Sequence, residues 1–153
     1  MGKFWALFGR LSVANIEIMR VTKAIFRPMK DKRSAIGTEG EQLAANYLIA
    51  QGFKLLAQNW RAGRAEVDLI FRSEKLLVFV EVKTRAANYF GSPGSFLTKA
   101  QEARIGMAAT AYCEEAGHEW EIRFDLIEVL LPPKGKPTLK HYPDAFYPGD
   151  TGW

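Results

Sequence analysis

The spacing of apolar residues divides the chain into segments of helical period and segments of strand period. In "EQLAANYLIAQGF" (41–53), apolar residues recur every three or four positions, which predicts a helix that follows Gly37–Gly40 and stops at Gly52. In "EWEIRFDLIEVLL" (119–131), apolar and polar residues alternate, which predicts a strand. The same criteria predict further strands at 53–61, 66–72 and 76–85, and a second helix at 97–117.

The predicted order is helix, three strands, helix and strand (αβββαβ). It is typical of one α/β domain in which a mixed sheet carries a helix on each face. We therefore expect three parts: an N-terminal extension (1–33), the α/β domain (34–131) and an extended tail (132–153) rich in Pro, Gly and Tyr.

Composition places the chain among ordinary globular proteins and excludes several kinds of site. Of its 153 residues, 48% are hydrophobic and 25% are charged. Cys113 is the single cysteine, so an intrachain disulfide is excluded, and a reducing, cytoplasmic location is expected. The two histidines, His118 and His141, lack zinc-finger spacing, and no nucleophile-elbow motif supports Ser-His-Asp chemistry.

The positive charge is concentrated at the N-terminus. Residues 1–33 hold eight Lys or Arg and two acids, a net charge of +6, whereas the remaining 13 basic and 15 acidic residues sum to −2. The apolar and basic residues before Pro28 lie at helical spacing, which is typical of a basic helix on an anionic membrane surface. A targeting extension and a true start at Met29 are the alternatives, and together they are favoured over membrane anchoring. All three interpretations stay open.

Charged residues interrupt the apolar hairpin "AEVDLIFRSEKLLVFVEVKTR" (65–85). Strand side chains alternate between faces, so Glu66 and Asp68 share one face, as do Glu81 and Lys83. A two-residue turn at 74–75 would place Asp68 opposite Glu81, where like charges repel. A divalent cation would relieve this repulsion, and with a neighbouring lysine it suits phosphodiester hydrolysis.

The alternative is an ordinary set of ion pairs. Glu66 would then pair with Lys83 across the strands, and Asp68 would bond Arg61 or Arg64 in the preceding turn. Asp125 on the last predicted strand lies near the site across the sheet in one interpretation, and is an ordinary strand-edge residue in the other.

An acid followed by Glu-x-Lys on the next strand, "D…EVK", resembles the PD-(D/E)XK signature of restriction-endonuclease-like nucleases. The wider pattern is more specific. It comprises Gly37-x-x-Gly40-Glu41-x-x-Ala44, Asn59-Trp60-Arg61, Glu66-Val67-Asp68-Leu69-Ile70 and Phe79-Val80-Glu81-Val82-Lys83-Thr84-Arg85. Over about residues 36–146, this pattern resembles the YraN family of bacterial proteins.

The resemblance implies an α/β, restriction-endonuclease-like core that binds nucleic acid. Carried onto this chain, it implies Asp68 and Glu81 as ligands of Mg²⁺ or Mn²⁺ and Lys83 as the catalytic lysine. Glu41 resembles an additional acid beside the metal, although a first-turn helix acid is also favoured by the helix dipole. Independently of the resemblance, Arg85, Lys99 and Arg104 are candidates for binding the phosphates of the nucleic acid. A solvated basic surface is the alternative for these three.

These observations predict a metal-dependent endonuclease that hydrolyses phosphodiester bonds in DNA or RNA. The alternatives are a non-catalytic nucleic-acid-binding module of the same fold, and a protein that contacts a membrane surface through residues 1–33. Both one chain and a homodimer are compatible with binding a duplex.

Overall fold

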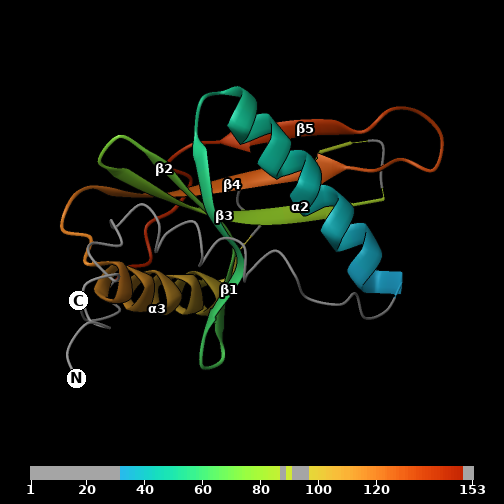
Figure 1. Ribbon diagram of the computed structural model, residues 1–153. Coiled ribbons are helices and arrows are strands. Elements are labelled where there is room, and N and C mark those ends of the chain that lie inside the picture. Colours follow the sequence, from blue (N-terminus) through green and yellow to red (C-terminus); the bar gives the residue numbers. More distant parts are fainter. Residues whose placement is uncertain (1–31, 87–88, 91–96, 150–153) are drawn as a thin grey trace, which may run out of the picture.

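The computed structural model describes residues 32–86, 89–90 and 97–149 (Figure 1). The elements in chain order are α2 (Lys32–Ala50), β1 (Lys54–Ala62), β2 (Ala65–Ser73), β3 (Leu76–Arg85), α3 (Lys99–Ala116), β4 (Ile122–Leu130) and β5 (Thr138–Tyr142). The four predicted strands and the second predicted helix are confirmed, with small differences at their ends.

The strands form one mixed sheet in the order β1-β2-β3-β4-β5, in which only the β3–β4 pair is parallel among the described residues. Helix α3 provides the crossover that a parallel pair needs between β3 and β4. Figure 1 shows α2 crossing one face of the sheet. Its buried residues Ala44 and Leu48 pack there with Leu69 and Val80. The predicted α/β fold is therefore confirmed.

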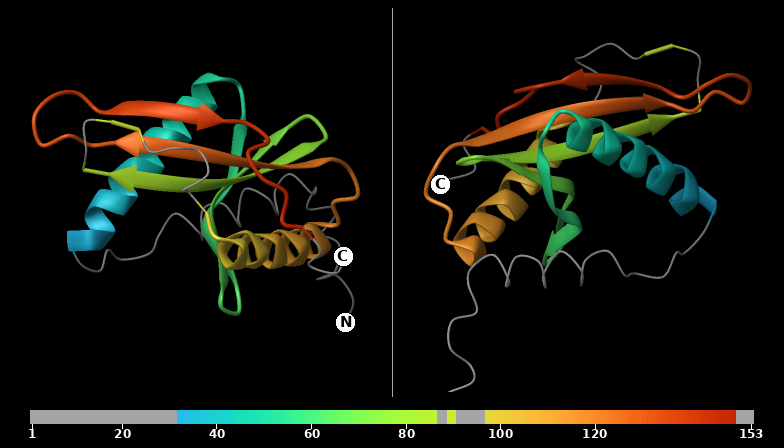
Figure 2. Two further views of the ribbon diagram at one scale, coloured as in Figure 1. Left: turned by 180° about the vertical axis from the view of Figure 1, so that it is seen from behind. Right: turned by 45° about the horizontal axis from the view of Figure 1, so that its top comes forward.

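Helix α3 covers the other face of the sheet. Its buried residues Ile105 and Ala109 pack against Ile70, Phe79 and Phe124. A capping box starts the helix, because the Thr98 hydroxyl accepts from the Gln101 N–H and the Gln101 side chain accepts from the Thr98 N–H. Figure 2 shows the β1–β2 turn passing beside α3 on this side of the molecule.

Helix α2 begins earlier than the sequence pattern predicts. The expected start was near residue 41, after a glycine-containing turn, but Gly37 and Gly40 lie within the helix. Gly40 is buried against β3, where an added Cβ would lie 2.9 Å from the Thr84 Cβ. The glycine that resembles a helix breaker in the sequence is thus a contact point between a helix and a strand.

The expected C-terminal tail contains a strand. Residues Thr138–Tyr142 form β5 and pair antiparallel with β4, with Ile127 opposite His141. The short strand lacked a strong alternating pattern because it is an edge strand with exposed positions.

The basic segment predicted at residues 1–33 lies outside the described residues, apart from the start of α2. Neither described helix combines length with enough apolar character to cross a bilayer.

Candidate nuclease site

Asp68 and Glu81 face each other just beyond the point where the pairing of β2 with β3 ends. Leu69 pairs with Val80, and the register continues to the Glu74 turn as a two-residue connection predicts. Asp68 and Glu81 are the next residues beyond that pair, on the face that α3 covers. The Val82 N–H donates to Asp68 Oδ2 at 2.7 Å, which holds this carboxyl group against β3.

The environment of Asp68 disfavours its charged form. Burial raises the pKa of Asp68 well above its usual value, and the negative charge of Glu81 raises it further. The hydrogen bond from Val82 acts in the opposite direction but does not compensate. The two carboxyl groups therefore form a site in which a second negative charge is unfavourable.

Lys83 lies next to this pair. Its Nζ is 2.9 Å from Glu81 Oε1, and the two side chains are 25% and 16% exposed. The alternative pairing of Glu66 with Lys83 is not the arrangement observed, because Glu66 pairs with Arg61 at 2.6 Å. Lys83 is thus held at the carboxyl end of β3, beside the two opposing acids.

Glu41 reaches the same region from α2. The close contact between Gly40 and Thr84 brings the N-terminal half of α2 onto β3. The Asn59 side-chain amide donates to Glu41 Oε2 at 2.9 Å. The pKa of Glu41 is raised, first by burial and then by Glu66 and Glu81, while the hydrogen bond from Asn59 lowers it.

Asn59 is part of the pattern that resembles the family, but the sequence assigned it no role in the site. It adopts a left-handed φ of 49° within β1, a conformation that asparagine tolerates better than most residues. In this conformation its side chain reaches Glu41. No local sequence pattern identifies such a contact, because it joins residues 18 positions apart.

The acids line an open cleft between the sheet and α3. Its volume is about 270 Å³, and it is lined by Arg64, Glu66, Asp68, Glu81, Gln101, Arg104 and Ile105. The lining residues come from the β1–β2 turn, from β2 and β3, and from the first two turns of α3. The structure therefore adds Arg64 and Gln101 to the residues that the sequence singled out.

The three predicted phosphate-binding residues have different surroundings. Arg104 lines the cleft. Arg85 forms an ion pair with the buried Glu128, at 2.9 Å between Nε and Oε1. Lys99 pairs with Glu102 at 2.7 Å on α3. Of the three, Arg104 alone lies on the cleft.

Asp125 lies on the opposite face of the sheet, so the interpretation that places it near the site is wrong. It is in register with Val80, whose side chain packs toward α2. Its carboxylate is buried, accepts two hydrogen bonds from Arg123, and lies 2.8 Å from His141 Nε2. The Asp144 N–H donates to it as well. Asp125 is therefore a structural link between β4, β5 and the following turn.

The cleft offers an incomplete set of metal ligands. Among the described residues, no three His, Cys, Asp or Glu side chains converge as a ready-made metal cage. Asp68 and Glu81 do supply two hard oxygen ligands that repel each other. Mg²⁺ is commonly held by one or two carboxylates, with water and substrate phosphates completing its shell. The residues present fit a cation of this kind.

Comparison with known proteins relates this cleft to a family. A model described as "Uncharacterised protein family UPF0102" matches residues 40–129, which include the four acids and the lysine discussed above.

Curated relatives of the chain carry the same description. A UPF0102 protein of Rhodococcus jostii is 39% identical over 113 residues, which cover 73% of this chain and 96% of that protein. One from Trichlorobacter lovleyi is 40% identical over 114 residues, 73% of this chain and 90% of the relative. One from Anaeromyxobacter dehalogenans is 41% identical over 117 residues, 76% and 87% of the two chains.

Proposed function

The chain belongs to the UPF0102 (YraN) family, a member of the restriction-endonuclease-like superfamily, and we propose that it is a divalent-metal-dependent endonuclease acting on DNA or RNA in the cytoplasm. The observation that carries this proposal is the pair Asp68 and Glu81. They are held opposite each other in an open cleft, with the pKa of Asp68 raised and Lys83 alongside.

Asp68 and Glu81 are the residues that would hold Mg²⁺ or Mn²⁺. When bound there, such a cation polarises a phosphoryl oxygen and favours hydroxide at neutral pH. Glu41 supplies a third carboxyl group nearby, and Asn59 orients it.

The protein's own groups perform the remaining functions. Val82 keeps the Asp68 carboxyl group in one orientation through its N–H. Lys83 places an ammonium group where negative charge develops on the phosphoryl group during hydrolysis. The pairing of Lys83 with Glu81 holds this ammonium group at the cleft before substrate arrives.

The test combines metal binding with cleavage. Calorimetry with Mg²⁺ and Mn²⁺ compares the wild type with Asp68→Asn, and the same samples are incubated with single-stranded, duplex, flap and four-way-junction DNA and with structured RNA. Glu114→Gln, an exposed acid on α3, is the matched control. We expect the wild type and Glu114→Gln to bind metal and cleave, and Asp68→Asn to do neither.

A wild-type protein that binds nucleic acid without binding metal or cleaving would contradict the proposal. The chain would then be a non-catalytic binding module of the same fold.

A further inference from the structure

Several cations on β1, β3 and α3 have a carboxylate partner. Four such pairs are Arg61–Glu66 at 2.6 Å, Lys83–Glu81 at 2.9 Å, Arg85–Glu128 at 2.9 Å and Lys99–Glu102 at 2.7 Å. A cation in such a pair must lose or share its partner when it binds an anion. These four residues are therefore less suited to the first capture of a phosphate group.

Arg64 and Arg104 differ from these residues. Both side chains are exposed and line the cleft, and within the described ranges neither forms an ion pair. Arg64 follows Gly63 in the β1–β2 turn, where Gly63 has a φ of 60°. Arg104 lies on the first part of α3. Two separate elements thus bring a guanidinium group to the same cleft.

The charge of the cleft shows what the arginines contribute. Its lining includes three acids, Glu66, Asp68 and Glu81, which by themselves repel a polyanion. The N–H groups at the start of α3 do not by themselves offset this negative charge, because the Gln101 N–H already donates to the Thr98 hydroxyl in the capping box. Attraction of a phosphate must come mainly from side chains.

The shape of the cleft favours a polymer over an enclosed small molecule. Small-molecule sites usually have about 300–1,000 Å³ and a mostly apolar lining. This cleft is open, has about 270 Å³, and has Ile105 as its one apolar lining residue. A nucleic-acid strand can cross such a surface with its backbone in the cleft and its bases outside.

We propose that Arg64 and Arg104 form a phosphate clamp that binds the backbone of one nucleic-acid strand beside the two acids. Guanidinium groups bind phosphate through two parallel hydrogen bonds, which fixes position as well as charge. Gln101, three residues before Arg104 on α3, also lines the cleft and supplies a neutral donor. The clamp rests on the proposed function only in taking nucleic acid as the ligand.

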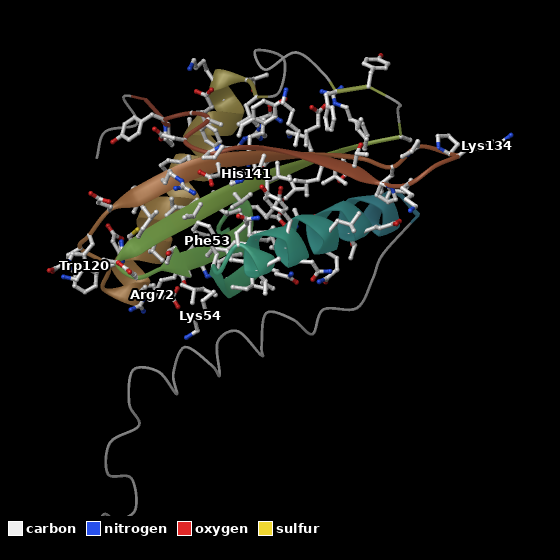
Figure 3. All side chains as sticks on the ribbon, turned by 90° about the horizontal axis from the view of Figure 1, so that it is seen from above. Phe53, Lys54, Arg72, Trp120, Lys134 and His141 are labelled. Atoms are coloured by element: carbon white, nitrogen blue, oxygen red, sulfur yellow. The ribbon has the colours of Figure 1, made fainter. Side chains whose placement is uncertain are left out.

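The clamp is tested by binding without cleavage. A fluorescently labelled single-stranded DNA oligonucleotide is titrated in EDTA with Asp68→Asn protein, which retains both arginines and carries one acid fewer in the cleft. Arg64→Ala and Arg104→Ala are added separately and together, and anisotropy is measured between 50 and 200 mM salt (roughly the range in which phosphate contacts are resolved). Lys134→Ala is the charge-matched control, because Lys134 is exposed at the far end of the β4–β5 loop (Figure 3).

Each arginine substitution should weaken binding about tenfold and reduce the slope of log K against log salt by about 0.7. The double variant should reduce that slope by about 1.4, whereas Arg104→Lys should retain the slope and lose part of the affinity. Equal effects of the arginine and Lys134 substitutions would overturn the clamp, as would an absence of binding by the Asp68→Asn protein.

Cleavage by the wild type separates this inference from the proposed function. Cleavage without any arginine effect on binding overturns the clamp alone. Binding that depends on both arginines, in a protein that does not cleave, supports the clamp and contradicts the nuclease.

Discussion

Replacing Asp68 by Asn should stabilise the metal-free protein. The substitution keeps an oxygen that can accept from the Val82 N–H, so the 2.7 Å hydrogen bond has a replacement acceptor. It removes the negative charge that faces Glu81, and it replaces a carboxyl group whose burial raises its pKa. An amide needs no proton to be neutral, so it avoids this penalty at neutral pH.

The size of the effect follows from the strand geometry. Directly opposed residues have Cβ atoms about 5 Å apart, and two unit charges at that separation repel by about 3 kcal/mol at an effective dielectric constant of about 20. Solvent, salt and the neighbouring Lys83 reduce this value. We expect the free energy of unfolding to rise by about 1–2 kcal/mol, and the melting temperature by about 5 °C.

The stabilisation should depend on pH in a definite direction. Because folding raises the pKa of Asp68, the folded wild type holds this proton more tightly than the unfolded chain does. The stability that Asp68 contributes is therefore fully present below its unfolded pKa of about 3.9, and it is lost as pH rises through the pKa of Asp68 in the folded protein. The difference in free energy of unfolding between Asp68→Asn and the wild type should therefore be small near about pH 4 and largest near about pH 8.

Urea denaturation in EDTA across this pH range, followed by the same series with Mg²⁺, measures both effects. At about one hundred times its dissociation constant, Mg²⁺ should stabilise the wild type by about 2.7 kcal/mol and leave Asp68→Asn unchanged, so the order of stability reverses. Glu66→Gln is the control, because Glu66 is paired with Arg61 and its loss should not stabilise the fold. A less stable Asp68→Asn protein at every pH would refute the repulsion between Asp68 and Glu81.

Three further outcomes are expected. Gly40→Ala should lower the free energy of unfolding by about 1–3 kcal/mol, since its Cβ would overlap Thr84. Gly37→Ala is the matched control, because an added Cβ there has nothing within 4 Å, and it should raise the free energy of unfolding by about 0.5–1 kcal/mol in the same thermal or urea melts. Lys83→Ala should retain metal binding by calorimetry but lower the cleavage rate at least about 100-fold; an unchanged rate would exclude its catalytic role. Asp125→Ala should destabilise the fold by about 3–5 kcal/mol. Because the pKa of Asp125 is lowered in the folded protein, the wild type should lose this stabilisation as pH falls through that pKa, which acid unfolding of wild type and variant would measure.

Much of the hairpin site could be predicted from strand periodicity. Side chains alternate along a strand, so residues two apart on β2 or on β3 share a face. The short turn at Glu74 sets the register that brings Asp68 toward Glu81. Both relations are local, so the sequence contains them. The pairing partners of Glu66 and Lys83 were less predictable, because long charged side chains reach more than one neighbour.

The rest of the cleft depends on contacts between distant segments. Glu41 approaches the acids because Gly40 lets α2 pack closely on Thr84, and Asn59, with its positive φ, donates to Glu41 from β1. In the sequence, the same glycine suggested a helix boundary. The position of Asp125 stayed open in the sequence for a related reason, because the face on which it lies depends on the register of two parallel strands joined through α3.

The sequence by itself determined the α/β class, the antiparallel hairpin and the acids and lysine on one of its faces, since these follow from local period and turn length. Only the tertiary structure decided which cations remain unpaired, that Arg64 and Arg104 meet at one cleft, and that Asp125 lies on the other face. The physical reason is that ion pairing and helix packing depend on distances across the sheet. Those distances are set by contacts between segments far apart in the chain, so they do not follow from the local spacing of residues.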